Sequence, residues 1–273
     1  MTIYRLALIR QDSLLAACFD RRTTSPFGTE VLDPYQSSPL SHKSAMDHMV
    51  DFLLRSNVVA DESDQPNLAL RRDLANALDI IKWRTHRESY DQLESAEIQY
   101  QCQIHHLDLQ FGFVKAWLCR PALRHLARLD TDTSGLTIER ELYAMCLQSA
   151  RYCLYAFVKL STLCDYPFRS WSIIHNGLST FLLLALSGEL KRDADLRATF
   201  GELLDLFESG YALPRADHHD IDQGAHLPPA YTRAIKALRQ MFLRDNITTT
   251  NDQNTLTSSC NRDLDATNPV IPR

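Results

Sequence analysis

The chain has 273 residues, of which 45% are hydrophobic and 23% charged, and this composition is typical of a soluble globular protein with one or two domains. Its net charge of −5 argues against the basic surface that nucleic-acid-binding domains usually carry. The longest apolar block, residues 181–186, is far shorter than the roughly 20 residues that cross a bilayer. Arg5 and Arg10 interrupt the apolar run that a signal peptide would need. We therefore expect an intracellular protein that binds neither membranes nor nucleic acid directly.

The hydrophobic pattern predicts helices along the chain and strands nowhere. Helical spacing over residues 4–19 is followed by a loop, 21–42, that is rich in Pro, Ser and Thr. Further helices are expected at 44–55, 68–83, 89–120, 137–163, 167–187, 190–208 and 229–244. From about residue 245 the composition is polar and typical of disorder. The predicted fold is all-α, with one helical domain over 1–244 and a disordered C-terminal tail over 245–273.

The predicted helix at 89–120 carries two apolar stripes on opposite sides. One comprises Ile98, Cys102, His105, Leu109, Phe113 and Ala116, and the other comprises Tyr100, Ile104, Leu107, Phe111, Val114 and Leu118. A helix that is apolar on two faces lies between other helices. We therefore expect a layered bundle around this long central helix, which Pro121 ends or kinks.

The seven cysteines are an odd number and include no C-x₂-C pair. Cys102, Cys119, Cys146 and Cys153 lie in predicted helices, and Cys164 directly follows one. This usage is typical of a reducing compartment, in which cysteine packs as a small buried hydrophobe.

Histidines suggest two metal sites, and each has a simpler explanation. His105 and His106 are neighbours on a helix and point about 100° apart, so they cannot share one ion. We interpret His105 as a core histidine and His106 as a solvated one. A loop cluster offers weak zinc ligands in His218, His219, Asp222 and His226. A flexible acidic surface loop explains this cluster more simply, because it offers no second shell to orient the ligands.

Four aromatic side chains are candidates for lining an effector cavity between helices: Tyr152, Tyr155, Trp171 and His175. An ordinary aromatic core is the simpler interpretation. No catalytic constellation is found, since no serine lies in a G-x-S-x-G turn and the glycines form no phosphate loop. We therefore expect no enzymatic activity.

Three segments, in order, resemble one family. The first is Gln11-Asp12-Ser13-Leu14-Leu15-Ala16-Ala17-Cys18-Phe19-Asp20-Arg21, which resembles the QDxLLSxxFDRP segment of the fungal-specific transcription factor domain, although Arg22 replaces its proline. The second runs from Ile104-His105-His106-Leu107 to Leu118-Cys119-Arg120-Pro121-Ala122-Leu123 and is similar to the family's LHLxY helix and RPxL turn. The third is Cys146-Leu147-Gln148-Ser149-Ala150-Arg151, followed by Trp171 and an apolar run to Leu186.

The resemblance implies a transcription regulator that acts in the nucleus. The family domain is the helical regulatory region of zinc-cluster factors, downstream of a six-cysteine cluster that binds DNA, and we find no such cluster in this chain. Zinc would belong to that missing cluster, and the chain would be N-terminally truncated with no cofactor of its own. The expected partners are other proteins, a full-length paralogue or a small effector that shifts the population of helical packings. Two alternatives are a stand-alone dominant-negative partner of a full-length factor and a small-molecule-binding protein or enzyme. If the resemblance fails, we expect the chain to be cytoplasmic.

Overall fold

The structure, a computed structural model, describes residues 39–58, 67–86, 97–126, 137–209 and 231–243. Nearly all of these residues are helical and none of them lies in a strand, so the all-α prediction is confirmed for this part of the chain. The chain divides into two compact units, Met1–Leu184 and Ala185–Arg273, and each is described by itself. The predicted helix over 4–19 and the predicted tail over 245–273 lie outside the described residues.

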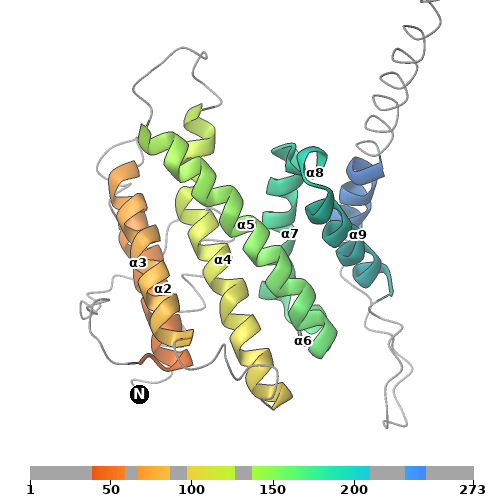
Figure 1. Ribbon diagram of the computed structural model, residues 1–273, viewed down its shortest axis with the longest axis horizontal. Coiled ribbons are helices and arrows are strands. Elements are labelled where there is room, and N and C mark those ends of the chain that lie inside the picture. Colours follow the sequence, from red (N-terminus) through yellow and green to blue (C-terminus); the bar gives the residue numbers. More distant parts are fainter. Residues whose placement is uncertain (1–38, 59–66, 87–96, 127–136, 210–230, 244–273) are drawn as a thin grey trace, which may run out of the picture. The chain divides into compact units, whose positions relative to one another are not determined.

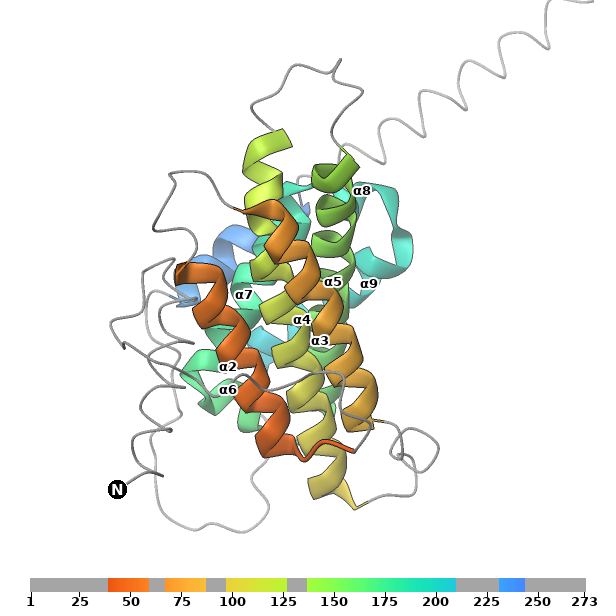
Figure 2. The ribbon, with the colours of Figure 1, turned by 90° about the vertical axis from the view of Figure 1, so that its left-hand side faces the viewer.

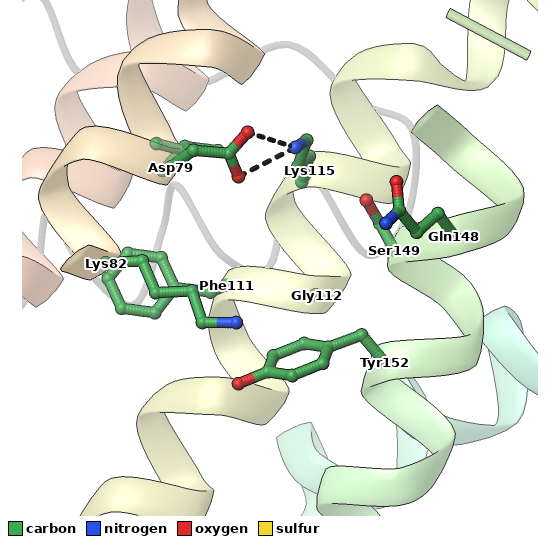
Figure 3. A pocket seen from close by; sticks show the side chains of 9 residues that line it. Asp79, Lys82, Phe111, Gly112, Lys115, Gln148, Ser149 and Tyr152 are labelled. Carbon is green, nitrogen blue, oxygen red and sulfur yellow. Dashed lines mark hydrogen bonds and ion pairs between the residues drawn. The ribbon is translucent and has the colours of Figure 1, made fainter. Parts of the chain in front are cut away.

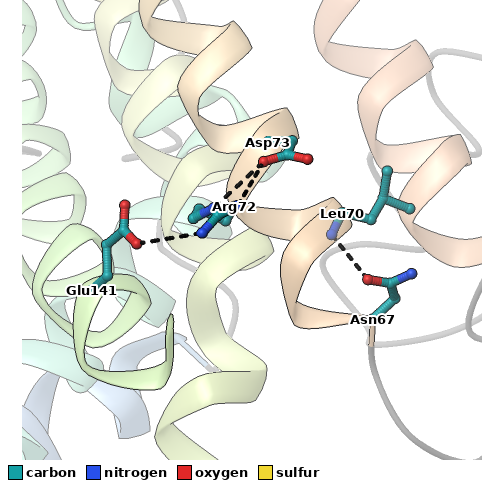
Figure 4. A network of polar contacts seen from close by, with 5 residues as sticks. All are labelled: Asn67, Leu70, Arg72, Asp73 and Glu141. Atoms are coloured by element: carbon teal, nitrogen blue, oxygen red, sulfur yellow. Dashed lines mark hydrogen bonds and ion pairs between the residues drawn. The ribbon is translucent and has the colours of Figure 1, made fainter. Parts of the chain in front are cut away.

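The first unit contains α2 (His42–Val58), α3 (Leu68–His86), α4 (Ile98–Leu126), α5 (Thr137–Leu163), α6 (Tyr166–Arg169) and most of α7 (Trp171–Leu186). Local capping explains where two of these helices begin. The Ser41 hydroxyl accepts a hydrogen bond from the amide of Ser44 at 3.2 Å, before α2. The Asn67 side-chain oxygen accepts one from the amide of Leu70 at 2.9 Å, before α3 (Figure 4).

Helix α4 is the central column of this unit, as its two apolar stripes predict. It packs against α2, α3 and α5, while α7 reaches it through a hydrogen bond from Asn176 to Gln110. Figures 1 and 2 show α2 and α3 as a pair beside α4 and α5. Most of the two stripes is buried, and only Ile98 and Tyr100 at the first turn are well exposed. Burial on both sides is the physical reason for the double pattern.

Helices α4 and α5 run antiparallel and approach closely at a glycine. A Cβ added at Gly112 would lie 3.0 Å from the Cβ and amide nitrogen of Cys153 and from the carbonyl oxygen of Ser149. Further along α5, a Cβ at Gly177 of α7 would lie 3.0 Å from the Phe157 ring. The two glycines therefore set how close α4 and α7 come to α5.

The prediction for the C-terminal end of the central helix needs correction, because α4 continues through Pro121 to Leu126. A proline inside a helix has no N–H for the carbonyl four residues earlier, which weakens the preceding turn. Neighbouring helices supply donors there. Arg71 Nη1 donates to the Leu118 carbonyl at 3.3 Å, and Cys146 Sγ donates to the Ala116 carbonyl at 3.3 Å. Tertiary hydrogen bonds thus support the turn that Pro121 disturbs.

Two helices that the sequence predicts as continuous are each divided. The helix expected at 167–187 is split into α6 and α7 by Ser170, whose backbone is extended. The helix expected at 190–208 is split into α8 (Glu189–Arg192) and α9 (Ala194–Ser209), because the Asp193 carboxylate accepts from the Leu196 amide at 3.0 Å and caps a new helix. Helix α7 is buried at Ile173, Phe181 and Leu184, whereas Leu186 at its C-terminal end is 69% exposed.

The second unit contains α8, α9 and a helical segment over 231–243. The rings of Phe200 and Phe242 stack with centroids 6.0 Å apart. Arg239 joins the same two segments through Asp205 at 2.6 Å and Glu208 at 2.9 Å. Within the described ranges, no helix has the length and apolar character needed to cross a bilayer.

Candidate functional site

A cavity of about 190 Å³ lies where α3, α4 and α5 meet (Figure 3). Its lining comprises Leu78, Asp79 and Lys82 from α3, Phe111, Gly112 and Lys115 from α4, and Gln148, Ser149 and Tyr152 from α5. Six of these nine residues are polar or charged, and Leu78, Phe111 and Gly112 supply the apolar part of the lining. We call this cavity the α3–α5 pocket.

Lys82 and Tyr152 face one another across the α3–α5 pocket (Figure 3). The Lys82 ammonium lies 3.3 Å from the centre of the Tyr152 ring, in cation–π contact. Burial lowers the pKa of Lys82 below the ordinary lysine value, and the charges of Asp108 and Asp79 oppose that shift in part. In the part of the chain that the structure describes, no ion pair joins Lys82 to a carboxylate. Its ammonium therefore has hydrogen-bonding capacity to offer a ligand.

The second lysine of the α3–α5 pocket is already paired. Lys115 Nζ lies 2.7 Å and 2.6 Å from the two carboxylate oxygens of Asp79. The Asp79 side chain is 58% exposed, so this ion pair lies at the pocket rim, where solvent screens it. The pair joins α3 to α4 and commits the Asp79 carboxylate to Lys115 rather than to Lys82.

A buried carboxylate adjoins the α3–α5 pocket and connects its three helices. Asp108 Oδ1 of α4 lies 2.9 Å from His86 Nε2 of α3. Burial alone would raise the pKa of Asp108, but hydrogen bonds from His86 and Tyr152 and the positive charges of His86 and Lys82 outweigh it and lower that pKa. Asp108 is therefore ionised at neutral pH, and the hydroxyl of Tyr152 is oriented toward it.

A second polar chain crosses the core away from the α3–α5 pocket. Asn176 Nδ2 donates to Gln110 Oε1 at 3.3 Å, and Gln110 Nε2 lies 3.4 Å from His106 Nε2. The His106 ring stacks on that of His42 and meets Tyr166 edge-on, each at 5.8 Å between centroids. His106 is thus half-buried among polar and aromatic groups, which corrects the expectation of a solvated side chain. Burial, aided by the charge of His42, lowers the pKa of His106 to about 4.

The four candidates for an aromatic effector cavity lie in different places. Tyr152 lines the α3–α5 pocket, whereas the other three are absent from its lining. The rings of Trp171 and His175 stack on each other along α7, with centroids 5.6 Å apart. Tyr155 is 42% exposed on α5.

The family-motif residues of the central helix lie in its first half, at His105, and in its second half, at Arg120 and Pro121. His105 is half-buried, with Nδ1 3.9 Å from Asp108 Oδ2, and burial lowers its pKa. Arg120 and Pro121 are half-buried near the C-terminal end of α4. Arg120 lies near Cys146 of α5: burial raises the pKa of that thiol to about 12, and the guanidinium charge opposes the rise.

Two other groups of candidates lie outside the described residues. They are the motif residues Gln11, Asp12, Phe19, Asp20 and Arg21, and the loop cluster His218, His219, Asp222 and His226. Among the residues that the structure does describe, no three His, Cys, Asp or Glu side chains gather as metal ligands would.

Sequence reasoning weighed Asp108 only as a metal ligand beside His105 and His106, and it did not identify Lys82 or Lys115 as site residues, although a signal was present. Asp108 stands between two leucines, and Lys115 interrupts an apolar run, in a helix that is predicted to be buried on both faces. Charged residues are seldom buried unless they are paired. Such interruptions therefore indicate positions at which neighbouring helices supply a partner.

Comparisons of this chain with protein-family models, with curated proteins and with solved structures found no match. The resemblance to the fungal regulatory domain therefore remains a prediction from the three motifs.

Proposed function

We propose that this chain regulates transcription, resembling the regulatory region of a fungal zinc-cluster factor, and that a small molecule bound in the α3–α5 pocket sets its activity. The observation that carries the proposal is the α3–α5 pocket itself, which is walled by three helices and contains a lysine with no carboxylate partner among the described residues. An occupant would contact α3, α4 and α5 at once and would favour one packing of these helices.

The placement of two family motifs supports the regulatory part of the proposal. Two of the family-like segments are distant in sequence but adjacent in the fold. One is the RPxL-like segment at Arg120 and Pro121 of α4, and the other begins at Cys146 of α5. Cys146 donates to a carbonyl of α4 one turn before Arg120. On the same resemblance, we propose that the chain acts in the nucleus. We also propose that a protein partner or a full-length paralogue binds the DNA.

The expected mechanism is a shift of population. A ligand that binds only one helical packing stabilises it by about 2.7 kcal/mol when its concentration is 100 times its Kd. That free energy inverts an equilibrium in which the competing packing is more stable by about 1 to 2 kcal/mol. Distant surfaces of the bundle would then change without any chemical step.

A reporter assay tests the regulatory proposal. The chain is fused to an unrelated sequence-specific DNA-binding domain, and transcription from its cognate promoter is compared with that from the DNA-binding domain alone. We expect a clear rise or fall. The control fusion carries Leu109→Pro, which breaks α4 at a fully buried position. Equal output from all three proteins at matched abundance would exclude a transcriptional role.

The α3–α5 pocket also favours a second candidate function, that of a small-molecule-binding protein or enzyme without a role in transcription. This alternative predicts ligand binding by the purified chain together with a silent reporter. Turnover of the bound molecule would further distinguish an enzyme from a binding protein.

A further inference from the structure

We propose that the α3–α5 pocket binds a small carboxylic acid with a short apolar or aromatic group, and that its carboxylate pairs with Lys82 Nζ. The inference rests on the proposed function only in naming this acid as the effector. Binding itself is a property of the α3–α5 pocket and can be tested in the purified chain.

The distribution of charge around Lys82 favours an added anion. The charged groups that face it are Asp79 on its own helix, Lys115 and Asp108 on α4, and the Tyr152 ring on α5. Asp79 is bound through both oxygens to Lys115, and Asp108 is bound to His86. Both carboxylates thus already have a partner in another side chain. An added anion would complete the coordination of the Lys82 ammonium in a partly desolvated place, where a charge-assisted hydrogen bond is strong.

Apolar residues near Lys82 favour a ligand that also carries an apolar group. Leu78 is buried on α3, Phe111 is buried on α4, and the backbone at Gly112 presents no side chain between them. Phe111 and Lys82 both line the α3–α5 pocket (Figure 3). An apolar group of the ligand would lie against these side chains while its carboxylate faces Lys82 and the Tyr152 ring edge. A bare inorganic anion would leave the apolar lining unused.

The volume of the cavity limits the ligand that it can enclose. The cavity of about 190 Å³ is smaller than the pockets of roughly 300 to 1,000 Å³ that accept drug-sized ligands. It suits a compact metabolite with one ring or a short branched chain.

Calorimetric titration of the purified full chain with benzoate, benzamide and inorganic phosphate tests the inference. Benzamide has the shape of benzoate without its charge. We expect benzoate to bind at least about tenfold more tightly than benzamide, as expected for a hydrogen bond to a charged group. Lys82→Met keeps most of the side-chain length and should weaken benzoate binding by a similar factor, whereas Lys82→Arg should retain much of it. Lys43→Met, on the exposed side of α2, is the matched control and should bind as the unaltered chain does.

Three results would overturn the inference: no benzoate binding, equal affinities for benzoate and benzamide, or full benzoate affinity in Lys82→Met. Phosphate binding without benzoate binding would indicate an inorganic-anion site and would also overturn it. If Lys82→Met does not fold, the pH dependence of the unaltered chain decides. Because the pKa of Lys82 is lowered, benzoate affinity should fall as pH rises through that pKa, below the ordinary lysine value of 10.5. Constant affinity over this range would contradict the role of Lys82.

The two proposals fail separately. Benzoate binding in the purified chain with a silent reporter would overturn the transcriptional role alone. An active reporter in a chain that binds none of these compounds would overturn the carboxylate site alone.

Discussion

His86 of α3 and Asp108 of α4 form a buried contact, with Nε2 and Oδ1 2.9 Å apart and with side chains only 3% and 5% exposed. The Tyr152 hydroxyl of α5 bonds to the same carboxylate. Three helices therefore converge on one negative charge directly beside the α3–α5 pocket. Since buried charges are tolerated only with partners, this contact should set how the three helices pack.

Removing this carboxylate should be strongly destabilising. Asp108→Ala leaves His86 and Tyr152 without their shared acceptor, and loss of one member of a buried pair costs about 3 to 5 kcal/mol. Asp79→Ala is the matched control, because Asp79 is exposed and its pair with Lys115 should contribute less than about 1 kcal/mol. Urea unfolding followed by circular dichroism measures both. Equal losses would show that the buried contact has no special weight.

Stability should fall in mild acid because of His106. Its pKa is about 4 in the folded chain against 6.5 as the ordinary value, so between these limits the unfolded chain takes up the proton first. The contribution of His106 to the free energy of unfolding is complete above pH 6.5 and is lost as pH falls toward 4. The loss is at most on the order of 3 kcal/mol. His106→Gln lacks this titration, so its free energy of unfolding should decline less over the same interval. Parallel curves for the two proteins would refute the assignment.

Alanine at two helical glycines should have opposite effects. Gly112→Ala places a Cβ 3.0 Å from backbone atoms of α5, which cannot move aside as a side chain does. Such overpacking costs about 1 to 3 kcal/mol, more than the roughly 1 kcal/mol of helix propensity that alanine adds. At Gly201 the nearest atom, in the Phe242 ring, is 3.4 Å away, so the propensity gain should remain. Thermal unfolding should therefore show a lower Tm for Gly112→Ala and an unchanged or higher one for Gly201→Ala.

Neighbouring arginines of α3 should differ in importance. Arg71 is buried, donates to the Leu118 carbonyl and lies 5.1 Å from the centre of the Trp117 ring. Arg71→Met removes a donor from the turn before Pro121 and should cost about 2 kcal/mol. Arg72 contacts the exposed Asp73 and Glu141, the latter at 3.9 Å (Figure 4), so Arg72→Met should cost less than about 0.5 kcal/mol. Similar urea midpoints for the two variants would contradict this reading.

The core cysteines should resist alkylation in the folded protein. Burial raises the pKa of Cys119 well above its usual range and raises the pKa values of Cys146 and Cys153 to about 12. Since the thiolate is the reactive species, iodoacetamide at neutral pH should modify these three only after unfolding. Peptide mapping by mass spectrometry before and after urea treatment measures this directly. Rapid labelling of Cys153 in the native chain would mean that the α5–α7 contact opens readily.

Local pattern determined much of the architecture. The absence of alternating apolar residues predicted helices, and the double stripe predicted that α4 would lie between others, because helical periodicity and burial are written into residue spacing. The same reasoning placed α5 between Thr137 and Leu163, as the structure has it. It placed the C-terminal end of the central helix at residue 120, before Pro121, whereas α4 continues to Leu126.

Only the tertiary structure decided what happens where helices meet. Arg71 and Cys146 carry donors to the turn before Pro121 from other helices, and no local spacing reveals this. The same holds for the α3–α5 pocket, whose lysine, carboxylate and tyrosine come from three helices. A single sequence records which side chains a helix offers, whereas the partner of each buried charge depends on how the helices cross. The fold class could therefore be predicted from the residues, and the candidate site could not.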